Sequence, residues 1–152
     1  MSKNISYSAV VLDEKSHELL ISKFEESIPK GWEVIAHHMT ITLGPLRNAK
    51  GKYDMSEQYP LGAPFSLNVI RMGRDDRAMA VEIRLPEGYS TRSQYPHITV
   101  AVNRKEGGKP WHSNQIDKGC FEDCAPFTLT GIVEEVPQKP SASGIDQITS
   151  KK

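Results

Sequence analysis

Histidine and threonine occur together twice in this chain at the same spacing. His38 is followed two residues later by Thr40, and His97 is followed two residues later by Thr99. Successive side chains of a strand point to opposite faces of the sheet. On a strand, each motif therefore places an imidazole beside a hydroxyl on one face and leaves aliphatic neighbours on the other face for a core.

This set of side chains suits the cleavage of a phosphodiester by a neighbouring hydroxyl. The reaction needs a base for the attacking hydroxyl and an acid for the leaving oxygen. Histidine titrates near neutral pH, so one neutral and one protonated imidazole can fill both roles without a metal ion. Each threonine can donate a hydrogen bond to a phosphate oxygen. The spacing does not assign which histidine is the base, and a single His-x-Thr also occurs in structural histidines; the repetition favours catalysis.

The other histidines and the two cysteines have simpler interpretations. We expect His37 on the opposite face from His38 as a hydrogen-bonded structural residue. We expect His17 in solvent on a helix. The sequence does not assign a role to His112. Cys120 and Cys124 are expected to be reduced thiols, because zinc needs more ligands at such spacings. A structural metal at these cysteines is the alternative.

Hydrophobic periodicity outlines the elements that must position the two motifs. A helix is expected after the capping residue Asp13 and before Pro29 and Gly31. The pattern predicts strands at 5–12, 65–72, 78–85 and 127–136, helices at 14–28 and 113–118, a turn at 73–77, and a long loop at 46–63. With the two motif strands, this order indicates an α+β domain.

Length and composition limit the class of protein. The chain has 152 residues, 38% of them hydrophobic, and a formal net charge of zero. We expect a single domain over 1–136, followed by a poorly ordered tail over 137–152 that is rich in proline and serine. Without a basic field, binding to long nucleic acid is not expected. No apolar run is long enough for a membrane or a signal peptide, which favours the cytoplasm.

At its two motifs the chain resembles the two-histidine phosphoesterase superfamily. The signature of that superfamily is a pair of His-x-Ser/Thr motifs with apolar flanks, and the resemblance covers about residues 5–136. It implies a bilobal, pseudo-symmetric α+β fold in which two antiparallel sheets face a central cleft. It also implies that His38 and His97 are catalytic, that Thr40 and Thr99 bind phosphate, and that no metal or other cofactor is used.

Two further segments narrow the resemblance. Tyr-x-Ala-Val-Val-Leu near the start and Ala-His-His-Met-Thr-Ile at the first motif are similar to phage anti-CBASS phosphodiesterases. Those enzymes degrade the cyclic di- and trinucleotide messengers of bacterial antiphage signalling. The similarity implies a hydrolase for cyclic oligonucleotides that acts in the host cytoplasm as a phage counter-defence. The alternatives are an RNA-processing phosphoesterase for 2′,3′-cyclic or 2′–5′ linkages, and a non-catalytic nucleotide sponge.

A nucleotide ligand also needs contacts to its bases. Tyr7 and Trp111 are the candidates for stacking, since aromatic rings stack on any base. Their alternative roles are a core tyrosine and a tryptophan that anchors a loop. Glu134 is expected opposite the core face of the last strand, where it can accept a hydrogen bond from a base or orient a histidine; a solvated carboxylate is the alternative.

Overall fold

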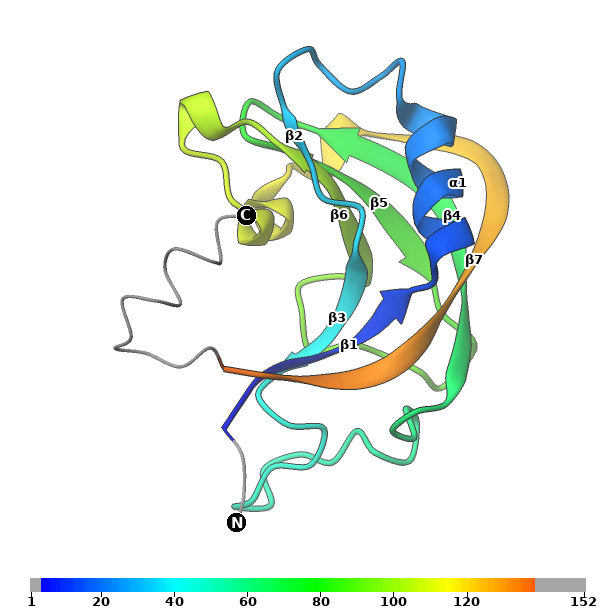
Figure 1. The fold of residues 1–152 in the computed structure, drawn as a ribbon, viewed down its shortest axis with the longest axis vertical. Coiled ribbons are helices and arrows are strands. Elements are labelled where there is room, and N and C mark those ends of the chain that lie inside the picture. Colours follow the sequence, from blue (N-terminus) through cyan, green and yellow to red (C-terminus); the bar gives the residue numbers. More distant parts are fainter. Residues whose placement is uncertain (1–3, 139–152) are drawn as a thin grey trace.

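One antiparallel sheet dominates the structure, a computed structural model that describes residues 4–138 (Figure 1). The strand order is β2-β6-β3-β1-β7-β4-β5, and β5 also pairs with β6. The sheet therefore closes on itself, and only β2 stands outside the ring. The expected mixture of helix and strand is confirmed. The strands are β1 Ile5–Leu12, β2 Glu33–Val34, β3 His38–Leu43, β4 Pro64–Arg74, β5 Ala78–Arg84, β6 His97–Val102 and β7 Phe121–Pro137.

The single α-helix of the described residues, α1 (Glu14–Phe24), begins as the sequence predicts. Asp13 is its N-cap, and the Asp13 carboxylate accepts a hydrogen bond from the backbone N–H of Ser16 at 2.8 Å. The helix ends at Phe24 instead of Ile28, because the N–H groups of Ser27 and Ile28 both donate to the Phe24 carbonyl in a tight turn. The predicted end was therefore wrong by one turn.

The segment after β6 contains three short 3₁₀ turns in place of the predicted helix at 113–118. They are η1 (Arg104–Glu106), η2 (Pro110–Gln115) and η3 (Lys118–Cys120). Gly108 precedes η2 at a point where a Cβ atom would collide with the Arg77 carbonyl oxygen. The glycine of this loop is thus required by close backbone approach, and η2 is held against the sheet.

The core lies on one face of the ring. Met39 and Ile41 of β3 and Ile98 and Val100 of β6 are fully buried in one cluster, which the helix residues Leu20 and Phe24 join. Figure 1 shows α1 beside the curved strand β7, and the rings of Phe24 and Phe127 are 6.0 Å apart. Met39, Ile41, Ile98 and Val100 of the motif strands therefore face the core, as the alternation predicts.

Strand boundaries agree best where alternation is regular. β1 has the predicted bounds, and β4 and β5 form the predicted antiparallel hairpin. β7 begins at Phe121, not at Phe127, and includes Pro137. The rest of the expected tail, residues 139–152, lies outside the described residues. Across residues 4–138, the one α-helix is too short to cross a bilayer.

Candidate active site

The two His-x-Thr motifs lie on neighbouring antiparallel strands. Met39, the middle residue of the first motif, pairs with Ile98, the middle residue of the second. Antiparallel pairing about this point brings His38 toward Thr99 and Thr40 toward His97. Because Met39 and Ile98 are both fully buried, their histidine and threonine neighbours emerge together on the opposite face of the sheet.

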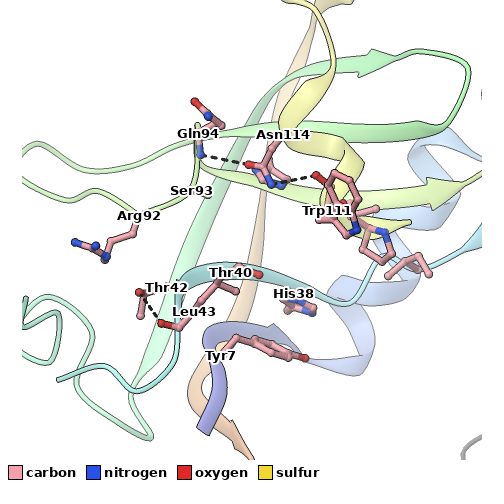
Figure 2. Close-up of a pocket in the computed structure, with 14 residues that line it drawn as sticks. Tyr7, His38, Thr40, Thr42, Leu43, Arg92, Ser93, Gln94, Trp111 and Asn114 are labelled. Carbon is pink, nitrogen blue, oxygen red and sulfur yellow. Dashed lines mark hydrogen bonds between the residues drawn. The ribbon is translucent and has the colours of Figure 1, made fainter. Parts of the chain in front are cut away.

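A cavity of about 700 Å³ opens on that face (Figure 2). Its volume lies within the roughly 300–1,000 Å³ that small-molecule sites occupy. Six of the seven residues expected at the site line it: Tyr7, His38, Thr40, His97, Thr99 and Trp111. No protein-family model matches this chain, and no curated protein matches it significantly. What the cavity can do is therefore derived from its own residues.

His97 is held in one tautomer. Its Nδ1 lies 2.7 Å from the carbonyl oxygen of Tyr95, which can only accept, so Nδ1 carries the proton. The unprotonated nitrogen of the neutral ring is then Nε2. The side chain is 7% exposed, and this burial lowers the pKa of His97, while the hydrogen bond to Tyr95 acts to raise it. A neutral ring with a free Nε2 has the state that a general base requires.

His38 has different surroundings. Its Nδ1 lies 2.8 Å from Nδ1 of His37, and the ring of Tyr7 stacks on it with centroids 4.8 Å apart. Burial, together with the smaller effects of the neighbouring His37 and His97, lowers the pKa of His38 to about 4. Only one of the two Nδ1 atoms can donate in the pair. When His37 donates, the proton of neutral His38 resides on Nε2.

His37 is hydrogen-bonded, as expected, but its expected place on the core face was wrong. Its side chain is exposed and pairs with His38. The reason lies one residue earlier, where Ala36 adopts the left-handed region with φ 46°. Strand β3 consequently begins at His38, and the face alternation does not extend back to His37.

His17 stabilises this unusual backbone and is not simply solvated. Its Nδ1 donates to the carbonyl oxygen of Ala36 at 2.7 Å, while the Ala36 N–H donates to the Thr99 carbonyl at 3.0 Å. A left-handed alanine costs free energy and persists only where its surroundings fix it. Helix α1 and strand β6 thus jointly fix the entry of the chain into the first motif.

The two threonines are not equivalent. The Thr99 hydroxyl is 2.7 Å from the buried Ser113 hydroxyl and donates to the Pro110 carbonyl at 3.1 Å. It ties strand β6 to η2. Within residues 4–138, the Thr40 hydroxyl has no hydrogen-bond partner. Thr40 is therefore the hydroxyl available to a ligand, whereas the hydrogen of Thr99 is donated to the Pro110 carbonyl.

A bulge interrupts β3 after the first motif. Ser8 pairs with Thr42 but Ala9 pairs with Thr40, so Ile41 is the extra residue. Leu43, which alternation places on the core face, is instead 79% exposed and lines the cavity. That expectation was wrong because a bulge reverses the alternation beyond it. Thr42 still borders the cavity, although its hydroxyl donates to the Leu43 carbonyl.

Of the two aromatic residues expected to contact a base, Trp111 is more accessible than Tyr7. It is 54% exposed, and its ring lies 3.9 Å from that of His112. His112, whose role was left open, is buried and its Nδ1 accepts from the Lys109 N–H at 3.0 Å. The buried His112 ring therefore packs against the ring of Trp111. Tyr7 lines the cavity, but one face of its ring is occupied by His38.

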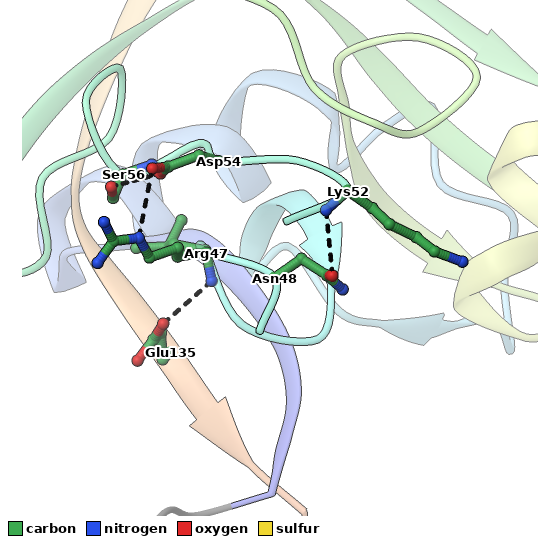
Figure 3. A network of polar contacts seen from close by, with 7 residues as sticks. Arg47, Asn48, Lys52, Asp54, Ser56 and Glu135 are labelled. Atoms are coloured by element: carbon green, nitrogen blue, oxygen red, sulfur yellow. Dashed lines mark hydrogen bonds and ion pairs between the residues drawn. The ribbon is translucent and has the colours of Figure 1, made fainter. Parts of the chain in front are cut away.

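Glu134 is exposed and does not line the cavity. It pairs with Ala9 in the sheet register, and its charge contributes, after burial, to raising the pKa of Tyr7. The adjacent Glu135 has a structural contact instead: its carboxylate accepts from the Leu46 N–H at 3.0 Å and anchors the 46–63 loop (Figure 3). The structure thus brings neither glutamate into the cavity.

The sequence did not predict four polar residues that line the cavity across from the two motifs. Arg92, Ser93, Gln94 and Asn114 also line the cavity. They belong to segments without periodicity, and the first is placed by a long-range contact, from the Arg92 N–H to the Ile41 carbonyl at 2.7 Å. No local pattern signals such a contact.

Metal-ligand geometry does not occur in the described part of the chain. No three histidine, cysteine or acidic side chains of residues 4–138 gather closely enough to hold an ion. Cys120 is exposed and Cys124 is half-buried, and both are free thiols.

Proposed function

We propose that this protein is a metal-independent phosphodiesterase that hydrolyses cyclic di- or trinucleotides to linear products. The observation that carries the proposal is the Met39–Ile98 pairing, which gathers two imidazoles and two hydroxyls on one cavity wall. No carboxylate is among the described residues that line this cavity. Its electrostatics therefore suit a phosphate anion.

His97 acts as the base in this proposal. Its free Nε2 takes the proton of a ribose 2′-OH, and the resulting oxygen attacks the adjacent 3′–5′ phosphorus. The Tyr95 carbonyl keeps the other ring nitrogen protonated and stabilises the imidazolium that forms. The new bond joins the 2′ oxygen to phosphorus, and the bond to the 5′ oxygen breaks.

His38 acts as the acid. The negative charge of a bound phosphate raises the pKa of His38 from about 4, so the ring gains a proton. His38 then gives this proton to the departing 5′ oxygen. The Thr40 hydroxyl donates to a phosphate oxygen and stabilises the charge that develops there. The product is a 2′,3′-cyclic phosphate end, which water can open by the reverse roles of the two histidines.

The proposal also includes the family of the fold and the biological role of the reaction. In this proposal the single closed sheet is a form of the bilobal two-histidine fold, and the neighbouring strands β3 and β6 each bring one motif to the cavity. Local two-fold symmetry about the Met39–Ile98 pair supports this correspondence. Cleavage of cyclic messengers would serve a phage in the host cytoplasm by evading CBASS defence.

Product analysis tests the proposal. The protein is incubated with a panel of cyclic di- and trinucleotides and 2′,3′-cyclic mononucleotides, with and without EDTA, and the products are separated by chromatography. Linear products from cyclic oligonucleotides, unaffected by EDTA, are expected. Turnover of only the cyclic mononucleotides would indicate an RNA-processing enzyme, and intact ligand released on denaturation would indicate a sponge.

A further inference from the structure

Arg92 differs from the other residues that line the cavity. It is the one formally charged side chain among those lining residues within the described chain, if both histidines are neutral. Figure 2 shows it on the side of Thr42 and Leu43, with Trp111 across the cavity. A guanidinium at this end raises the affinity of the cavity for an anion at a point away from the histidine pair.

The structure holds Arg92 in place without using the N–H groups of its guanidinium. Its backbone N–H donates to the Ile41 carbonyl at 2.7 Å. Its guanidinium lies over the ring of Tyr53, 4.3 Å from the centroid. Tyr53 is itself fixed, because its hydroxyl is within hydrogen-bond distance of the Pro45 carbonyl at 2.9 Å and the Leu43 carbonyl at 3.2 Å.

Most other arginines of the described chain have their guanidinium groups occupied. Arg47 pairs with Asp54, and Arg104 pairs with Glu33 at 2.6 Å. Across residues 4–138, the guanidinium of Arg92 makes no hydrogen bond or ion pair, and it lies over the Tyr53 ring. Stacking on a ring leaves the donors in the guanidinium plane free, and their fork geometry matches two oxygens of a phosphate.

We propose that Arg92 forms a second phosphate subsite of this cavity. This inference rests on the proposed function: the first phosphate lies at the histidines, and Arg92 binds a second phosphate of the same ligand. A cyclic dinucleotide has two phosphodiesters on opposite sides of its ring, whereas a 2′,3′-cyclic mononucleotide has one. Arg92 thereby selects cyclic oligonucleotides over cyclic mononucleotides.

The 46–63 loop has a defined part in this selection. Its lysines Lys50 and Lys52 do not line the cavity. The loop supplies Tyr53, the ring on which Arg92 rests. The loop after the first motif thus contributes to ligand choice through an aromatic support instead of through its own positive charges.

Calorimetric binding measurements test the subsite. The ligands are a 2′-deoxy analogue of cyclic di-AMP, which lacks the attacking hydroxyl, and 2′,3′-cyclic AMP. Arg92→Gln is expected to weaken binding of the dinucleotide about tenfold or more, the loss typical of a charge-assisted hydrogen bond. Binding of the mononucleotide stays within about twofold. Arg84→Gln is the matched control, because Arg84 is exposed but does not line the cavity.

The outcomes separate the subsite from the chemistry. Dinucleotide binding that depends on Arg92, together with no cleavage of any cyclic di- or trinucleotide of the panel, would support the subsite and refute the phosphodiesterase. Equal weakening of both ligands, no weakening of either, or the same loss in Arg84→Gln would overturn the subsite. Failure of the wild-type protein to bind the dinucleotide would overturn it as well.

Discussion

Met39 pairs with Ile98 across two antiparallel strands, so the middle residues of the two His-x-Thr motifs lie side by side. Both are fully buried, and the motif histidines and threonines share the opposite face. The local symmetry of this pair does not extend to its surroundings. His38 is bordered by His37 and Tyr7, whereas His97 is bordered by the Tyr95 carbonyl. This asymmetry divides the roles of the two imidazoles.

The two threonines should respond differently to substitution. Thr40→Val is expected to lower kcat about 10- to 100-fold through loss of a hydrogen bond to the reacting phosphate, with an unchanged free energy of unfolding. Thr99→Val leaves the buried Ser113 hydroxyl without its partner and should lower the free energy of unfolding by about 1–3 kcal/mol. Steady-state kinetics and urea unfolding on both variants measure the difference. Identical effects of the two substitutions would contradict it.

His37 is expected to control the state of His38. Removing it in His37→Ala takes away one of the electrostatic causes that lower the pKa of His38, so this pKa should rise from about 4, though only in part because burial is the larger cause. Nitrogen-15 NMR of the imidazoles reports both this pKa and the tautomer. In the wild type, neutral His38 should carry its proton on Nε2. A protonated Nδ1 on His38, unchanged in the variant, would rule out the donor role of His37.

Acid should destabilise the fold through His38. Its pKa is about 4 in the folded protein against an ordinary value of 6.5, so between these values the unfolded chain binds more protons. The contribution is complete above pH 6.5 and is lost as the pH falls toward 4, by up to about 3 kcal/mol. Burial lowers the pKa of His97 in the same direction. Urea unfolding between pH 7 and pH 4 should show a shallower decline for His38→Gln; equal slopes would count against a depressed pKa.

Trp111 should affect binding more than chemistry. Its exposed ring offers a stacking surface worth about 1–3 kcal/mol per base, so Trp111→Ala is expected to raise KM about tenfold and to change kcat little. Trp111→Phe retains a ring and should recover most of the affinity. If Trp111 only anchors its loop, Trp111→Ala will lower the unfolding temperature and leave KM unchanged, which thermal unfolding beside the kinetics will reveal.

The sequence predicts which side chains share a face of the two motif strands. It does not predict where these strands end or which strands they pair with. Alternation places His97 and Thr99 opposite Ile98, because strand geometry has a period of two residues. It fails at His37 and Leu43, where a left-handed alanine and a bulge change the backbone. Both features are imposed by contacts with distant residues.

The residues of the opposite cavity wall could not be predicted from the sequence for the same reason. Arg92 belongs to a segment without periodicity, and its position depends on Ile41 and Tyr53 from other parts of the chain. His17 and His112 likewise have partners that only the folded chain supplies. Local patterns predict elements, whereas these contacts arise from how the elements pack.

The most direct measurement is the single-turnover rate of cyclic di-AMP cleavage by the wild-type protein, His38→Ala and His97→Ala, with the 2′-deoxy analogue in parallel. Loss of a general acid or base should slow cleavage by about 10²–10⁴-fold in each variant, and the analogue should remain intact. Cleavage by either variant within about tenfold of the wild-type rate would contradict the catalytic pair. Efficient cleavage of the 2′-deoxy analogue would contradict attack by the ribose hydroxyl.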